Sequence, residues 1–153
     1  MPTPTPFLWF NNNAEAAADF YLTLFPNGRK LGELRCNEAG PGPIGSLLVM
    51  DLELNGQPMT FMNGGPGHPP TDAFSFSVLC QTQAEIDTYW SQLTADGGSE
   101  IACGWLKDKF GLCWQIVPAG IHELLSHPAA MRAMMAMKKM DIAILQQAAN
   151  QIG

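Results

Sequence analysis

The strongest constraint on the fold is a strand–helix pattern that occurs twice. The segments FLWFNNNAEAAADFYLTLFPNG (7–28) and FSVLCQTQAEIDTYWSQLTADGG (76–98) each begin with apolar residues typical of a strand and end at a glycine. Ala14 in the first segment corresponds to Ala84 in the second, and Gly28 corresponds to Gly98 at the same offset. Self-similarity at a fixed offset indicates a duplicated structural unit, so we predict two copies of one fold.

A helix is predicted between the strand and the glycine of each copy. Asn12-x-x-Glu15 and Thr82-x-x-Glu85 fit the capping box, in which two side chains bond the free backbone N–H groups of the first helical turn. Apolar residues then recur at helical spacing. They are Phe20, Leu24 and Phe25 in the first copy, and Ile86, Tyr89, Trp90 and Leu93 in the second.

Further strands follow each helix. Asn55-Gly56 is a strong hairpin signal in the first copy, whereas Lys107-Asp108-Lys109 in the second is interpreted as an exposed turn. Strands are expected over 30–36, 46–54 and 59–62 in the first copy, and over 100–106 and 112–117 in the second. The second copy is therefore expected to be abbreviated. The predicted fold class is α+β, with two βαβββ-type units in a curved mixed sheet and C-terminal helices.

We expect a single domain over residues 1–153, with repeat units at about 5–63 and 72–118 joined by a Gly- and Pro-rich loop, and a helical tail over 119–153. Met131, Met134, Met135, Met137 and Met140 leave little of the tail surface polar. Two interpretations stay open: the tail packs on its own domain, or it docks on a second subunit, since methionine suits adaptable interfaces.

The charge and the cysteine pattern of the chain argue against several classes of ligand. The net charge of −6 provides no positive field for phosphates, so we expect neither nucleic acid nor an anionic membrane as a ligand. No segment approaches the length needed to cross a bilayer and no leader pattern is present, which predicts a cytoplasmic protein. The four cysteines form no C-x-x-C pair and are predicted to be buried thiols rather than zinc ligands or disulfides.

Three motifs carry a family resemblance: LWFNNNAEAAADFY, MNGGPG and CGWLKDKFGLCWQIVP. Together with the duplicated unit, they resemble the PhnB-like branch of the vicinal oxygen chelate superfamily, which includes glyoxalase, extradiol dioxygenases and bleomycin-resistance proteins. Members of this branch are often labelled 3-demethylubiquinone-9 3-methyltransferase. The chain gives that label no physical support, because its Gly64–Gly67 run leads into His68-Pro69-Pro70 and not into a helix.

The alternation of side chains along a strand predicts which residues face a binding cup. Phe74, Phe76 and Val78 form an apolar face for the helix, which turns Ser75 and Ser77 toward the cup. In the last strand, Cys113 and Gln115 share one face. A symmetric hairpin would place Cys103 opposite Gln115 and Trp105 opposite Cys113. The predicted ligand-binding floor consists of six residues: Ser75, Ser77, Cys103, Trp105, Cys113 and Gln115. Asn63 and Trp9 are predicted as further ligand-binding residues.

The resemblance also implies where a metal would bind. Metal-using relatives hold a divalent ion with histidine or glutamine and glutamate, and Gln115 stands where their last strand carries glutamate. The histidine positions fall near Ala73 and near Thr5 or Pro6, which offer no side-chain ligand. His122 and His127 are five residues apart, so they cannot clamp one ion from a helix. We therefore predict no cofactor and no metal ligands.

The function expected from these observations is the binding of a small molecule in a metal-free cup by a homodimer, as bleomycin-resistance proteins bind ligands without chemistry. The polar residues would orient the ligand and apolar walls would supply affinity. Whether any reaction is catalysed stays open. The alternative is a metal-dependent lyase, isomerase or dioxygenase of the same superfamily.

Overall fold

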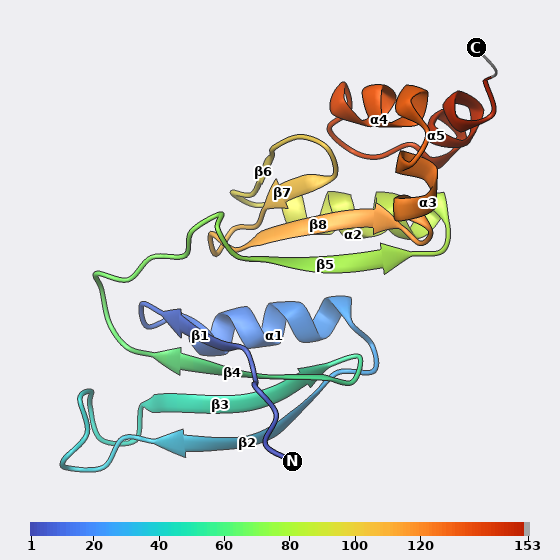
Figure 1. The fold of residues 1–153 in the computed structure, drawn as a ribbon. Helices are drawn as coiled ribbons and strands as arrows, with labels where there is room; N and C mark the ends of the chain where they lie inside the picture. The colour runs from blue at the N-terminus through green and yellow to red at the C-terminus, as the bar shows by residue number, and fades with distance from the viewer. Residues whose placement is uncertain (152–153) are drawn as a thin grey trace. The chain divides into compact units, whose positions relative to one another are not determined.

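The computed structural model describes residues 1–151, and the chain divides into two compact units, Met1–Pro70 and Thr71–Gly153 (Figure 1). Both units follow the order β-α-β-β-β, and the second continues into three helices. The boundary falls at the end of the Gly- and Pro-rich loop that the sequence suggested as the junction. The expected fold class is confirmed: each unit builds a mixed four-stranded sheet with a helix against it.

The first unit places its strands in the order β1-β4-β3-β2, with β1 and β4 parallel and the other pairs antiparallel. Its helix α1 packs on β3 and β4, where the Tyr21 and Phe61 rings meet edge to face with centroids 5.9 Å apart. The elements are β1 (Phe7–Phe10), α1 (Ala14–Leu24), β2 (Arg29–Arg35), β3 (Leu47–Leu54) and β4 (Gln57–Asn63).

The start of α1 differs from the expected capping box. The N-cap residue is Asn13, and its side chain makes no capping hydrogen bond. Asn12 has a φ of 64°, which lies in the left-handed region and outside the helix. Asn63 supplies the missing acceptor from β4, because its Oδ1 accepts the backbone N–H of Ala14 at 2.9 Å. The cap is therefore made by a residue far away in the sequence.

The second unit repeats the topology with the order β5-β8-β7-β6. The capping box of Thr82 and Glu85 is present as predicted. Ile86, Trp90 and Leu93 are the buried face of the helix that covers β7 and β8. The elements are β5 (Ser75–Cys80), α2 (Gln83–Thr94), β6 (Ser99–Glu100), β7 (Trp105–Lys107) and β8 (Cys113–Pro118).

The expected single strand over 100–106 is wrong. The chain turns between Glu100 and Trp105, and β6 and β7 pair as an antiparallel hairpin, so the second unit has the same number of strands as the first. Cys103 and Gly104 both adopt positive φ in this turn, at 56° and 83°. Cysteine rarely adopts this conformation, which is why the residue pattern did not indicate a turn.

The repeated glycines have the same structural role in both units. A Cβ built on Gly28 would lie 2.9 Å from the carbonyl oxygen of Glu53 in β3, and one on Gly98 would lie 2.9 Å from that of Lys107 in β7. Real Cβ atoms do not approach backbone that closely. Each glycine therefore lets the chain leave its helix and pass against a strand, which supports the duplication.

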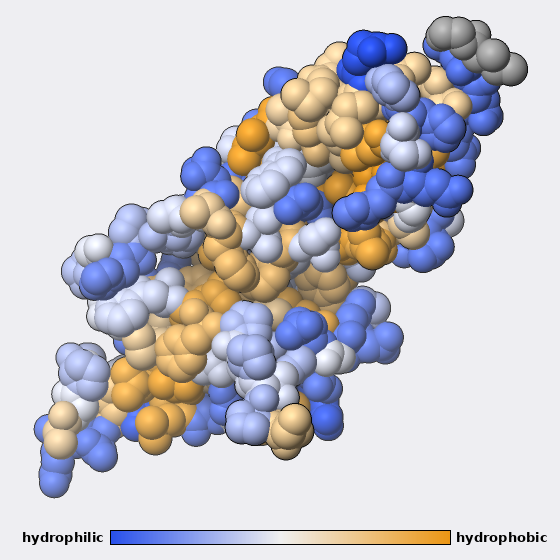
Figure 2. All heavy atoms as spheres, in the orientation of Figure 1, coloured by the Kyte–Doolittle hydropathy of each residue, from blue (hydrophilic) through white to orange (hydrophobic). Residues whose placement is uncertain are grey.

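The tail packs on the second unit. Its helices are α3 (Ile121–Leu125), α4 (Pro128–Met135) and α5 (Ile142–Ala149). Ile121, Met140 and Leu145 form a buried cluster with Val117 of β8, and full burial of such a side chain contributes about 1.5–3 kcal/mol. Apolar atoms also reach the surface over the tail (Figure 2), where Met131, Met135 and Ile144 are exposed. No helix within residues 1–151 has the length and apolar character to span a bilayer.

Candidate functional site

A pocket of about 290 Å³ lies in the second unit between its sheet and the tail helices. Its floor comes from β5, β8 and the segment 103–105, and the tail supplies the opposite wall. The lining residues are Ser77, Leu79, Cys103, Trp105, Gln115 and Val117 from the sheet side, with Ile121, His122, Leu125, Met134 and Met140 from the tail. Four of the predicted floor residues therefore line one pocket.

Strand pairing explains why three of these side chains gather. Gln115 on β8 pairs with Trp105 on β7 and with Ser77 on β5, so the three residues form a row across the sheet. Directly paired residues present their side chains on the same face. The neighbouring residue Trp114 turns the other way and is buried against the helix side, as the alternation predicted.

The hairpin register differs from the predicted one by two residues. Trp105 pairs with Gln115, and Cys113 pairs with Lys107. The cause is Asp108, which was expected in an exposed turn but is only 2% exposed. Its carboxylate accepts the backbone N–H groups of Phe110 and Leu112, which fixes a longer loop. A slip of two residues keeps every side chain on its predicted face.

Gln115 is oriented by its neighbour on β5. Its Nε2 donates a hydrogen bond to Ser75 Oγ at 2.9 Å, so Ser75 positions the amide from outside the pocket lining. Within residues 1–151, no hydrogen bond joins the Gln115 Oε1 atom to another protein group. The amide thus keeps one acceptor and one N–H for a ligand.

The four tryptophans separate into two classes. The indole N–H groups of three are bonded inside the protein: Trp9 to the Gly65 carbonyl at 2.8 Å, Trp90 to Glu100 at 2.7 Å, and Trp114 to Asp108 at 2.8 Å. In the part of the chain that the structure describes, Trp105 has no such acceptor, although it is half-buried and lines the pocket. A half-buried indole N–H without a protein partner is open to a ligand or to water.

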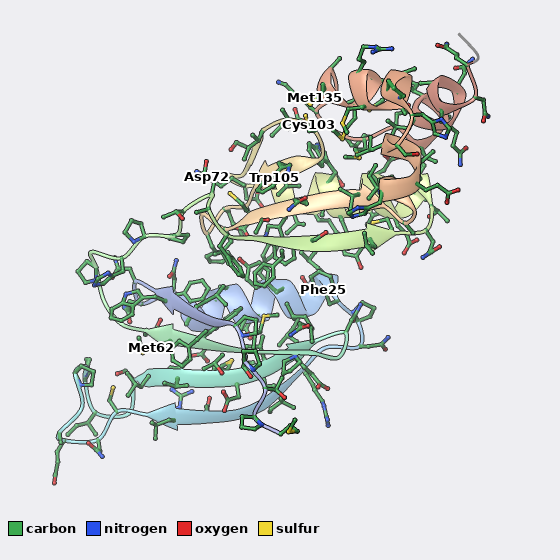
Figure 3. All side chains as sticks on the ribbon, in the orientation of Figure 1. Phe25, Met62, Asp72, Cys103, Trp105 and Met135 are labelled. Carbon is green, nitrogen blue, oxygen red and sulfur yellow. The ribbon has the colours of Figure 1, made fainter. Side chains whose placement is uncertain are left out.

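Cys103 lies beside the tail, outside the regular strands. Its backbone N–H donates to the Met137 carbonyl at 2.8 Å, and that of Gly104 donates to the Lys138 carbonyl at 2.8 Å. The Cys103 Sγ is 3.9 Å from the Met135 Sδ, and Figure 3 shows the two side chains next to each other near Trp105. Cys103 is therefore held at the junction between the floor and the tail.

Cys113 faces the same way as Gln115 but is buried and does not line the pocket. Burial raises the pKa of the Cys113 thiol, and it raises the pKa of Cys80 to about 11. Both thiols are thus held in the neutral form, which is a poor nucleophile. All four cysteines are free.

Trp9 and Asn63 belong to the first unit. Both amide atoms of Asn63 are engaged there, since its Nδ2 also donates to the Leu47 carbonyl at 3.1 Å. The Trp9 ring lies against Gly64, where a Cβ would come within 2.2 Å of it, and its centroid is 4.6 Å from that of His68. These contacts explain both residues structurally, and a part for them in ligand binding stays a prediction.

The donors near the pocket do not suit a divalent ion. Residues 1–151 contain no cluster of three or more His, Cys, Asp or Glu side chains that could hold one. The floor offers an amide, a hydroxyl, an indole and the Cys103 thiol, and His122 is the only imidazole among the described lining residues. His127 is the N-cap of α4 and lies on a different helix from His122. One thiol and one imidazole without a carboxylate fall short of the ligand set that offsets the lost hydration of a divalent cation.

No sequence pattern indicates that the tail residues line the pocket. In the sequence, His122 stands out only as a possible metal ligand, and Met134 only as part of an apolar helix. A helical apolar pattern indicates burial but does not indicate which surface the helix covers. The position of His122 and Met134 opposite the sheet depends on tertiary packing.

Comparison with known proteins gives the family. The family model described as 3-demethylubiquinone-9 3-methyltransferase matches residues 2–117. The chain belongs to this family. The predicted PhnB-like membership is thereby confirmed. No curated protein is matched by the chain.

The chain is similar to a PhnB protein from Bacillus cereus, with 33% identity and a TM-score of 0.69, and the match covers 77% of this chain and 100% of that one. It is also similar to protein PA1353 from Pseudomonas aeruginosa, at 20% identity and a TM-score of 0.62 over 77% and 98% of the two chains. The fosfomycin resistance protein FosX from Mesorhizobium loti shares the fold at 10% identity, with a TM-score of 0.59 over 82% and 97%.

Proposed function

We propose that the second unit binds a small molecule in the pocket between its sheet and the tail. The apolar walls supply most of the affinity. Trp105 donates a hydrogen bond from its indole N–H, and Gln115 presents an amide that Ser75 holds in place. A largely apolar pocket with a few convergent polar groups is the usual form of a ligand site.

The observation that supports this proposal best is that the indole N–H of Trp105 has no hydrogen-bond acceptor within residues 1–151. The other three tryptophans satisfy their N–H groups inside the protein, and Trp105 has no acceptor within residues 1–151. A ligand carbonyl or hydroxyl oxygen would complete this bond. The same ligand can then reach the free atoms of the Gln115 amide, since the two residues are directly paired.

The side chains that line the pocket favour ligand binding without a metal ion. A metal-dependent lyase, isomerase or dioxygenase would need several imidazole or carboxylate ligands, and the described lining residues offer one imidazole, His122, and no carboxylate. The methyltransferase description of the family also gains no support from the fold, because the glycines at 64–67 follow β4 in a loop and do not open a helix. Binding of a ligand without metal chemistry is therefore the function that these residues favour over the metal-dependent alternative.

Replacing Trp105 tests the proposal. A thermal-shift screen of small metabolites identifies compounds that stabilise the wild-type protein, because a ligand raises stability with the logarithm of its concentration over Kd. Trp105→Phe keeps an aromatic ring and removes the N–H, so affinity should fall about 2- to 10-fold, as expected for one hydrogen bond. Trp90→Phe is the matched control, since the Trp90 N–H is bonded to Glu100 and the side chain does not line the pocket. Equal effects of both variants, or no stabilising compound, would count against the proposal.

We also propose that the chain is a cytoplasmic homodimer. The exposed apolar side chains of α4 and α5, such as Met135 at 64% and Ile144 at 48% exposure, favour association with a second copy. Four free thiols suit a reducing compartment. Sedimentation equilibrium should give twice the mass of one chain, and the mass of a single chain at micromolar concentration would contradict the dimer.

A further inference from the structure

The wall of the pocket opposite the sheet lies beyond the part of the chain that matches the family. The family model ends at residue 117, and 77% of this chain suffices to cover the whole Bacillus cereus protein. Ile121, His122, Leu125, Met134 and Met140 follow that point and form nearly half of the pocket lining. The matched region supplies the floor, and the tail supplies the rest.

The tail is fixed over the floor by specific bonds. The Gln83 side chain of α2 donates to the Met140 carbonyl at 3.0 Å and accepts the backbone N–H of Ile142 at 2.8 Å. Lys139 forms an ion pair with Asp87 of the same helix at 2.8 Å. These contacts fix the chain just before and just after Met140, so the tail is held in place as a wall of the pocket.

The wall has a distinct chemistry. Met134 and Met140 present thioether sulfur, which makes favourable contacts with aromatic rings, and Trp105 lies in the same pocket. Among the described residues that line the pocket, none is Lys, Arg, Asp or Glu, and His122 is the single imidazole. A charged ligand would lose hydration on entry without gaining a carboxylate, ammonium or guanidinium partner.

We propose that the tail is the specificity element of the site and selects uncharged molecules that carry an aromatic ring, with Met134 as a determinant of that selection. This inference rests on the proposed ligand-binding function. The floor supplies the hydrogen bonds that orient the ligand. The tail excludes ionised ligands and contacts the ring.

A set of probes that differ in charge on one ring system tests the selection. 2-Naphthamide is neutral, 2-naphthoate is an anion and 2-naphthylmethylamine is a cation at neutral pH, and their dissociation constants can be measured by isothermal titration calorimetry. The wild-type protein should bind the amide at least about tenfold more tightly than either ion, because each ion must be desolvated.

Met134→Lys should weaken the preference for the amide over the anion. A lysine in the wall provides a partner for the carboxylate, so the ratio of naphthoate to naphthamide affinity should rise at least about tenfold. Met131→Lys is the matched control, since Met131 lies on the same helix but is exposed and does not line the pocket. Leu125→Lys repeats the test from α3, and far-ultraviolet circular dichroism checks that each variant is folded.

The outcomes separate this inference from the proposed function. If Trp105→Phe weakens amide binding while Met134→Lys and Leu125→Lys leave the affinity ratio unchanged, ligand binding stands and selection by the tail is wrong. Tight binding of naphthoate to the wild-type protein would also overturn the selection. If the wild-type protein binds none of the three probes although the thermal-shift screen finds a stabilising compound, only the selection is wrong, and if neither experiment finds a ligand, both proposals fail.

Discussion

Among single residues, Asp108 shows how a charged side chain fixes the hairpin on which the site depends. It is buried, and its carboxylate accepts hydrogen bonds from the backbone of Phe110 and Leu112 and from the indole of Trp114. These bonds set the loop length between β7 and β8. The loop length in turn places Trp105 opposite Gln115.

Asp108→Asn should therefore destabilise the fold. An amide presents one oxygen where the carboxylate presents two, so at least one hydrogen bond to a charged group is lost, at a cost of about 1.5–3 kcal/mol. Urea denaturation measures the change in the free energy of unfolding. The exposed Asp96, whose φ of 55° asparagine tolerates, gives the control Asp96→Asn. Similar values for the two variants would show that the Asp108 bonds do not hold the loop.

The four cysteines should differ in reactivity at pH 8. Cys103 is half-buried, whereas Cys36, Cys80 and Cys113 are buried. With a pKa of about 11, Cys80 is about one part in a thousand thiolate at this pH. Iodoacetamide should modify Cys103 first, as peptide mass spectrometry can follow. Raising the pH toward 11 increases the thiolate of Cys80, and modification of Cys80 as fast as Cys103 at pH 8 would contradict the structure.

At the scale of helices and strands, local patterns predicted most elements. The Thr82 and Glu85 capping box and the apolar face of α2 are sequence-local features, and both are present. The cap of α1 could not be predicted, because the acceptor on Asn63 comes from a strand 49 residues away. The turn at Cys103 was hidden for another reason, since a cysteine with positive φ gives no local signal.

Gln83 connects two elements, and its replacement should loosen the tail. Gln83→Ala removes the hydrogen bonds to the Met140 carbonyl and the Ile142 N–H, worth about 1–3 kcal/mol together. Amides of the segment 137–145 should exchange with deuterium faster, while α2 keeps its protection because the capping box is intact. Gln81→Ala is the control. Unchanged exchange in the tail would show that Gln83 does not anchor it.

At the scale of the whole molecule, one duplicated unit serves as scaffold and the tail completes the site. Strand alternation was sufficient to bring Ser77, Trp105 and Gln115 to one pocket, because side-chain parity survives a register error of two residues, whereas Cys103 reaches the pocket from a turn. It could not predict that Met134 faces them. The position of a helix on a sheet is set by packing between distant segments, and no short pattern encodes it.

On the proposed function, the Trp105 N–H and the Gln115 amide bind a ligand in this pocket. Titration of ¹⁵N-labelled protein with 2-naphthamide, followed by ¹H–¹⁵N correlation spectra, observes both groups directly. The Trp105 indole signal and the Gln115 side-chain signals should move together as the probe binds, while the indole signals of Trp90 and Trp114 stay in place because protein carboxylates hold them. A probe that binds without moving the Trp105 and Gln115 signals would show that these two groups do not hold the ligand, and a lack of binding at millimolar concentration would count against the site.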